Sequence, residues 1–124
     1  MLQDWVAAAY FSGDSGPILV DSGDSNRHSK PPTICGFVPD LYARRDLVGG
    51  IIIGEAKTPS DLENYHTRAQ LAAFLGKCAE DASSVLVVAT PWHSERIAKA
   101  VLRHVQRHTD LDDVNAIVLE QLGA

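Results

Sequence analysis

The run of residues 84–90 restricts the fold of this chain more than any other segment. Its sequence is Ser-Val-Leu-Val-Val-Ala-Thr, and Pro91 ends it, so the run has the length of a strand. A strand that is apolar at almost every position is typical of a sheet covered on both faces. The run therefore predicts an α/β protein with this strand inside the sheet.

The remaining elements are predicted on either side of this strand. Three strands are expected before the first long helix, after which strands and helices alternate in the overall order α-β-β-β-α-β-α-β. This order predicts an α/β sandwich, in which helices cover both faces of a mixed sheet that begins with a hairpin. The expected elements are a helix over residues 2–11, strands over 17–21, 33–43 and 51–57, a helix that runs to residue 82 from the N-cap Ser60 with Glu63 as its capping-box partner, the strand 84–90, a helix from the cap Ser94 to residue 108, and a strand over 115–120.

The composition limits the class of protein. The 124 residues are 45% hydrophobic and 22% charged, which predicts a single globular domain. No apolar run approaches the roughly 20 residues of a membrane helix, and the first residues lack a basic segment. Cys35 and Cys78 lack metal-ligand spacing, so we expect two buried thiols in the reducing cytoplasm. The net charge of −5 argues against a polybasic nucleic-acid binder but permits a nuclease, because catalytic carboxylates add negative charge.

The segment that carries most chemical information contains two short motifs, Pro39-Asp40 and, on the next expected strand, Glu55-Ala56-Lys57. Glu55 and Lys57 are two positions apart on one expected strand, so both side chains lie on the same face. If the strand of Asp40 pairs with this strand, Asp40 and Glu55 converge. Two adjacent carboxylates suit Mg²⁺ or Mn²⁺, and a lysine beside them offsets charge and orients a water or stabilises a phosphate. Metal-assisted phosphodiester hydrolysis requires these parts.

This segment resembles the PD-(D/E)XK nuclease superfamily, which has the restriction-endonuclease-like fold. An apolar run precedes Glu55-Ala56-Lys57 and a helix follows, as in archaeal Holliday-junction resolvases and related small endonucleases. The resemblance implies a three-layer sandwich with an αβββαβ core. It also implies a Mg²⁺-dependent deoxyribonuclease, with an endonuclease acting on branched or structured DNA favoured. By this resemblance Asp40, Glu55 and the carbonyl of Ala56 hold the metal, and Lys57 positions the attacking water.

Further residues compare with the same superfamily. Gln70 and Phe74 stand where some branches carry Gln-x-x-x-Tyr, and the resemblance implies that Gln70 assists by holding a water or a phosphate. Many members carry an acidic residue on the first helix as an additional metal ligand. Asp4 is the acid available there, while Asp21 and Asp24, near the first strand, are rivals for the role.

Several basic and aromatic residues are candidates for contact with nucleic acid. Those expected nearest the site are Arg44, Arg45 and Arg68. A basic stripe on the last helix is favoured as a solvated face over a DNA contact; its members are Arg96, Lys99, Arg103 and Arg107. Three other residues are favoured as ordinary packing or surface residues over a metal site or a base-stacking platform: His104, His108 and Trp92.

A domain of this size lacks a separate DNA-reading module. Specificity is therefore expected from a homodimer, from DNA shape, or from a larger complex in which the chain is one subunit. The acidic net charge and the weak N-terminal acid favour an alternative, a catalytically inactive nuclease-fold domain that binds nucleic acid or a protein partner. Gln70 gives slight support to a third reading, activity on RNA or with exonuclease polarity.

Overall fold

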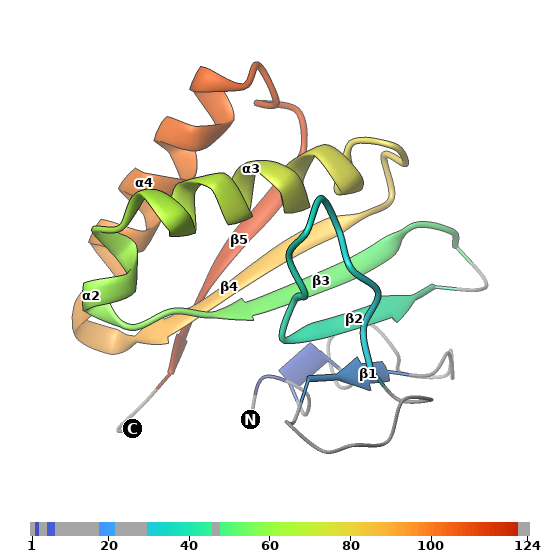
Figure 1. Ribbon diagram of the computed structural model, residues 1–124, viewed down its shortest axis with the longest axis horizontal. Helices are drawn as coiled ribbons and strands as arrows, with labels where there is room; N and C mark the ends of the chain where they lie inside the picture. The colour runs from blue at the N-terminus through green and yellow to red at the C-terminus, as the bar shows by residue number, and fades with distance from the viewer. Residues whose placement is uncertain (1, 3–4, 7–17, 22–29, 46–47, 122–124) are drawn as a thin grey trace.

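The computed structural model describes residues 2, 5–6, 18–21, 30–45 and 48–121, which form a five-stranded mixed sheet with two long helices on one face (Figure 1). No helix in this described part is long and apolar enough to cross a membrane. The strands are β1 (Ile18–Val20), β2 (Leu41–Arg44), β3 (Ile51–Ala56), β4 (Val85–Pro91) and β5 (Asn115–Gln121). The helices are α2 (Pro59–Leu62), α3 (Tyr65–Cys78), the 3₁₀ helix η2 (Trp92–Ser94) and α4 (Glu95–His108).

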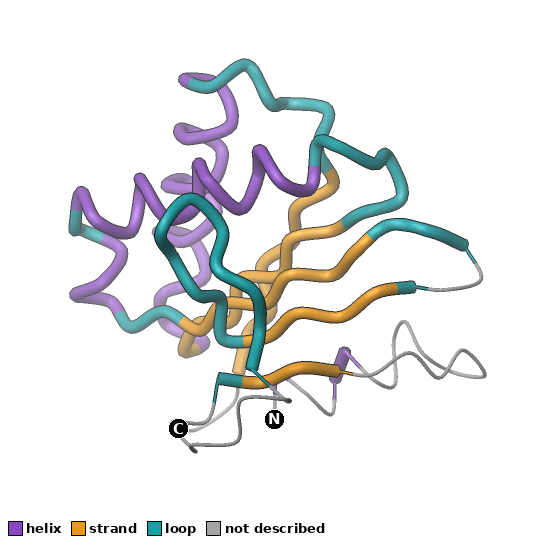
Figure 2. Tube along the Cα trace, turned by 45° about the vertical axis from the view of Figure 1, so that its right-hand side comes forward, coloured by secondary structure: helices purple, strands orange, loops and turns teal. Residues whose placement is uncertain are grey.

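The strands lie in the sheet in chain order, β1-β2-β3-β4-β5, as the labels in Figure 1 show; Figure 2 gives the same sheet from another side. β1 pairs with β2 and β2 with β3 in antiparallel fashion, whereas β3–β4 and β4–β5 are parallel pairs. The two parallel connections contain α3 and α4, as crossovers between parallel strands require. The predicted mixed sheet, antiparallel first and parallel later, is confirmed.

Apolar side chains cover the sheet on both faces. On one face Leu86 and Val88 of β4 pack with Phe74 of α3 and Leu102 of α4. On the other face Val87 packs in a second cluster that includes side chains at positions 2, 5 and 6. The expected burial of the apolar strand on both faces is therefore confirmed. The three N-terminal residues just named are helical, and the rest of the expected helix 2–11 lies outside the described residues.

The predicted strand over residues 33–43 is wrong as far as residue 40. Residues 33–39 form a turn closed by a bridge between Ile34 and Phe37, and β2 begins only at Leu41. Cys35 and Gly36 have positive φ angles of 50° and 85°, which a strand does not allow. The turn also leaves Cys35 exposed, against the expectation of burial, whereas Cys78 is buried and both thiols are free.

The predicted continuous helix over residues 60–82 is also wrong, because the chain forms two helices there. The N-cap of α2 is Thr58, which forms a capping box with Asp61. After one turn Asn64 starts a new helix, α3, by accepting a hydrogen bond from the His66 N–H at 2.8 Å. The expected cap Ser60 lies inside α2, and α3 ends at residue 78. Thr, Ser, Asn and Asp are all favourable N-cap residues, so this segment of the sequence contains several possible helix starts.

Candidate active site

Strand pairing brings Asp40 and Glu55 together. Leu41 of β2 lies opposite Gly54 of β3 in an antiparallel pair. Asp40, which precedes Leu41, therefore lies opposite Glu55, which follows Gly54. The backbone N–H of Asp40 donates a hydrogen bond to Glu55 Oε1 at 2.9 Å, and Asp40 Oδ2 accepts one from the Ala56 N–H at 2.8 Å. The predicted convergence of the two carboxylates is therefore present in the structure.

Lys57 lies one step beyond the end of β3, on the face that carries Glu55. Its Nζ is 3.0 Å from Glu55 Oε2 and donates a second hydrogen bond to Oε1 of Gln70 on α3. The backbone N–H of Lys57 donates to the carbonyl of Ala89 at 2.8 Å, which fixes the strand end against β4. Glu55 is 3% exposed and Lys57 9% exposed, so the ion pair is largely removed from water.

Burial controls the protonation of Glu55. Loss of hydration raises the pKa of its carboxyl from 4.5 to about 7, and the negative charge of Asp40 adds to the increase. Hydrogen bonding and charge attraction from Lys57 act in the opposite direction. A carboxyl with a pKa near neutrality changes charge easily, and bound cations favour its ionised form.

The donor set is two carboxylates, and the Ala56 carbonyl is next to them in the chain. Oxygen donors of this kind are those that Mg²⁺ and Mn²⁺ prefer. Among the described residues no hydrogen bond is made to the other carboxylate oxygen, Asp40 Oδ1. In the part of the chain that the structure describes, no group of three or more His, Cys, Asp or Glu side chains forms a complete ligand set. The residues present thus fit a cation that retains several waters, as Mg²⁺ does.

Of the candidates for an additional acidic ligand, only Asp21 lies in the described part. Its backbone N–H donates to the carbonyl of Asp40 at 2.9 Å, which continues the pairing of β1 with β2. Asp21 is therefore the next residue across the sheet from Asp40, on the same face, with an exposed side chain. Asp4 and Asp24 lie outside the described residues.

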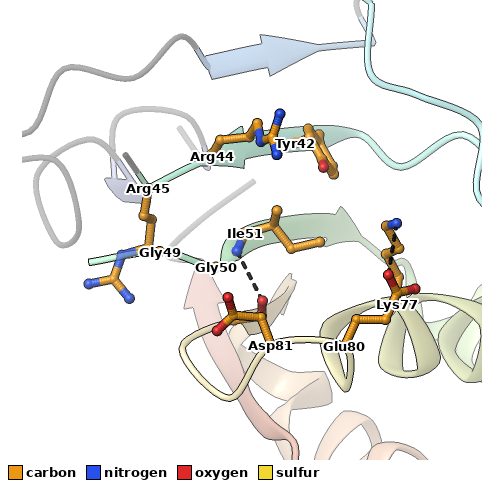
Figure 3. Close-up of a pocket in the computed structure, with 10 residues that line it drawn as sticks. Tyr42, Arg44, Arg45, Gly49, Gly50, Ile51, Lys77, Glu80 and Asp81 are labelled. Carbon is orange, nitrogen blue, oxygen red and sulfur yellow. Dashed lines mark hydrogen bonds and ion pairs between the residues drawn. The ribbon is translucent and has the colours of Figure 1, made fainter. Parts of the chain in front are cut away.

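Arg44 and Arg45 lie at the opposite end of the β2–β3 pair. They line a cavity of about 460 Å³ together with Gly49, Gly50 and Lys77 (Figure 3). Arg44 is four residues along the chain from Asp40, or about 14 Å along an extended strand. Neither arginine therefore lies beside the two carboxylates, although Arg44 is the last residue of β2, the strand that begins directly after Asp40.

The other predicted contact residues lie on the helices. Arg68 stacks over the ring of Tyr65 at 5.5 Å and lines a groove between α3 and α4. His104 and His108 stack on each other in the same groove. Trp92 is 58% exposed at the end of β4, which leaves stacking and oligomer contacts open to it. The basic stripe residues Arg96, Lys99, Arg103 and Arg107 are exposed, as a solvated face predicts.

The sequence assigns no functional role to Thr90 and predicts Ser94 only as the cap of the last helix. Ser94 is at the N-cap position of α4, but its side chain makes no capping hydrogen bond. Both hydroxyls are buried, and neither has a hydrogen-bond partner among the described residues. Thr90 follows Ala89, the register partner of Ala56, so Thr90 is the neighbour of Lys57 across the β3–β4 pair. Only the parallel register brings these two residues together, and no local pattern in the sequence indicates it.

Comparisons of this chain with models of protein families, with curated proteins and with solved structures gave no match.

Proposed function

We propose that this chain is a Mg²⁺- or Mn²⁺-dependent nuclease with the restriction-endonuclease-like fold, acting on DNA phosphodiester bonds. The observation that supports it best is the convergence of Asp40, Glu55 and Lys57 at the adjoining ends of two strands. Residues that are fifteen or more positions apart in the chain meet there in the order that the PD-(D/E)XK pattern requires.

Each residue of this group has a role in the proposed reaction. Asp40, Glu55 and the Ala56 carbonyl bind the cation, which when bound polarises the phosphodiester and stabilises its developing charge. Lys57, held by Glu55 and Gln70, positions the attacking water and places a positive charge near the phosphate. Gln70 keeps the lysine in this orientation because it accepts one of its three N–H donors.

The alternative function is a catalytically inactive domain that binds nucleic acid or a protein partner. The burial of both Glu55 and Lys57 supports it, since a buried, paired lysine and glutamate can serve structure alone. The two functions differ in whether the chain hydrolyses DNA. Both are compatible with a role as one subunit of a larger complex.

A cleavage assay tests the proposal. Labelled single-stranded, duplex, flapped and four-way-junction DNA is incubated with the protein in Mg²⁺ or Mn²⁺, beside the Lys57→Ala and Lys77→Ala variants. We expect cleavage by the wild type and by Lys77→Ala, whose lysine pairs with Glu80 far from the carboxylates. Cleavage by Lys57→Ala should fall at least 100-fold. Equal cleavage by all three proteins would indicate a contaminant, and no cleavage by a folded wild type would favour the binding domain.

A further inference from the structure

Among the strands that the structure describes, β5 is the last on one side of the sheet. It pairs with β4 over all seven residues, Asn115 to Gln121, and forms the edge of the sheet (Figure 2). Within the described part of the chain, its backbone makes no hydrogen bond to any segment other than β4. A strand that ends a sheet in this way presents a row of unpaired donors and acceptors.

The sequence of β5 carries little of the usual protection of an edge strand, since its one charged residue is Glu120. Natural edges carry lysine, proline, a bulge or a covering loop, which prevent pairing with another chain. Asn-Ala-Ile-Val-Leu-Glu-Gln contains neither lysine nor proline, and its register with β4 is continuous, without a bulge. By contrast, the described part of the other edge strand, β1, is only three residues long.

A second copy of β5 is complementary to the first. The strand has a central residue, Val118, and two antiparallel copies with Val118 opposite Val118 pair all seven positions. In this register Glu120 of each copy lies opposite Ala116 of the other. Opposite residues of an antiparallel pair project to the same face of the sheet. The side chain of Glu120 therefore lies next to the groups that cover Ala116 of the other copy.

A groove that contains the basic residue Arg103 lies above Ala116. It has a volume of about 350 Å³ and is lined by Arg103 and Lys99 of α4 and by Ala116 and Val118; Lys99 forms an ion pair with Glu95 of its own helix. Arg103 is exposed and forms no ion pair with a described residue. Glu120 is exposed on the same face of the sheet as Val118. The pairing therefore places the carboxylate of one copy in the groove that contains Arg103 of the other, twice by symmetry.

We propose that two copies of this chain associate through β5, antiparallel and with Val118 on the two-fold axis, to form one continuous ten-stranded sheet. The proposal does not depend on nuclease activity. It does fix the spacing of the two carboxylate sites, because Glu55, Val88 and Val118 are register partners across the sheet. The two copies of Glu55 are then five strand spacings apart, about 24 Å, at the same level along the strands.

Cysteine cross-linking tests the register. In a Cys35→Ser background, Val118→Cys places one cysteine of each copy directly opposite the other. Their Cα atoms are then about 5 Å apart, a distance that a disulfide can span. Asn115→Cys is the matched control on the same strand, with its two copies about 20 Å apart. Mild oxidation should give a covalent dimer with Val118→Cys and none with Asn115→Cys. Equal yields from the two variants, or no dimer from either, would overturn the register.

Sedimentation velocity tests the association and its charges. We expect the wild type to be a dimer, and Glu120→Arg to dissociate at least tenfold more readily because it opposes Arg103. The variant should fold, since Glu120 is exposed and its side chain reaches Glu95 of the same chain. The double exchange Glu120→Arg with Arg103→Glu should restore the dimer. A monomeric wild type, including one whose β5 pairs with a different protein, would refute the proposal, as would a dimer unaffected by Glu120→Arg.

Discussion

The backbone N–H of Asp40 donates a hydrogen bond to the carboxylate of Glu55 at 2.9 Å. The carboxylate of Asp40 in turn accepts from the N–H of Ala56, the residue after Glu55. Each carboxylate therefore accepts a hydrogen bond from the backbone of the strand end that carries the other carboxylate. This reciprocal arrangement keeps the two carboxyl groups adjacent without a bound cation. Burial of Glu55 raises the pKa of its carboxyl, and the negative charge of Asp40 contributes to the increase.

The first prediction concerns pH and stability. Folding raises the pKa of Glu55 from 4.5 to about 7, so the folded state holds a proton that the unfolded state releases. Without divalent cations the free energy of unfolding should therefore fall as the pH rises from about 4.5 to 7. The loss contributed by Glu55 is up to about 3 kcal/mol. Urea denaturation at pH 5 and pH 8 measures it.

Glu55→Gln is the matched control for this prediction, because glutamine does not titrate. The wild type should lose more stability between pH 5 and pH 8 than the variant does. Parallel pH dependences for the two proteins would contradict the raised pKa. Saturating Mg²⁺ should reduce the wild-type loss, since a bound cation stabilises the ionised carboxylate.

The second prediction concerns Gln70. Its side chain accepts a hydrogen bond from Lys57, so Gln70→Leu should leave the lysine less well positioned. We expect kcat for DNA cleavage to fall about tenfold with KM nearly unchanged. Gln70→Glu restores an acceptor and should recover part of the rate. A rise in KM alone would instead assign Gln70 to substrate binding.

The third prediction concerns Phe74, a buried aromatic residue of α3. Its ring is fully buried and lies edge-on to Phe37 with centroids 6.5 Å apart. Phe74→Tyr would therefore bury a hydroxyl in an apolar cluster and lower stability by about 1–3 kcal/mol. Thermal or urea unfolding checks this. A variant as stable as the wild type would show that a polar partner is within reach of the ring.

The fourth prediction compares two glycines. Gly50 has φ +82°, and a Cβ there would lie 2.7 Å from the backbone carbon of Ser83, so Gly50→Ala should destabilise the protein by more than about 1 kcal/mol. Gly76 lies in α3 with open space around it, so Gly76→Ala should stabilise by roughly 0.5–1 kcal/mol. Urea unfolding of both variants measures the difference. Effects of the same sign would contradict this account.

Periodicity in the sequence predicted β3, β4 and the last helix well. The strand at 84–90 and the helix at 94–108 differ from β4 and α4 by a single residue at their ends. Both segments have a strong pattern, apolar throughout in one and amphipathic in the other. The break at Asn64 and the turn before β2 were not predictable in this way, because they depend on cap competition and on positive φ angles.

The candidate site was predictable only in part. Residue types and their spacing pointed to Asp40, Glu55 and Lys57, and the antiparallel pairing brought them together. The neighbours contributed by β4 could not be predicted, since the register that places Thr90 beside Lys57 is set by packing between distant strands. Arg44 and Arg45 lie at the far end of the β2–β3 pair because the chain runs along β2 away from Asp40 before it reaches them.

Calorimetric titration with Mn²⁺ at pH 8 tests the central claim, that Asp40 and Glu55 bind a divalent cation. The wild type is compared with Asp40→Asn and with Asp81→Asn, which alters an exposed carboxylate beside the separate cavity at the other end of β3. We predict saturable heat for the wild type and for Asp81→Asn, and none for Asp40→Asn. Absence of heat in the wild type, or unchanged binding by Asp40→Asn, would contradict the claim.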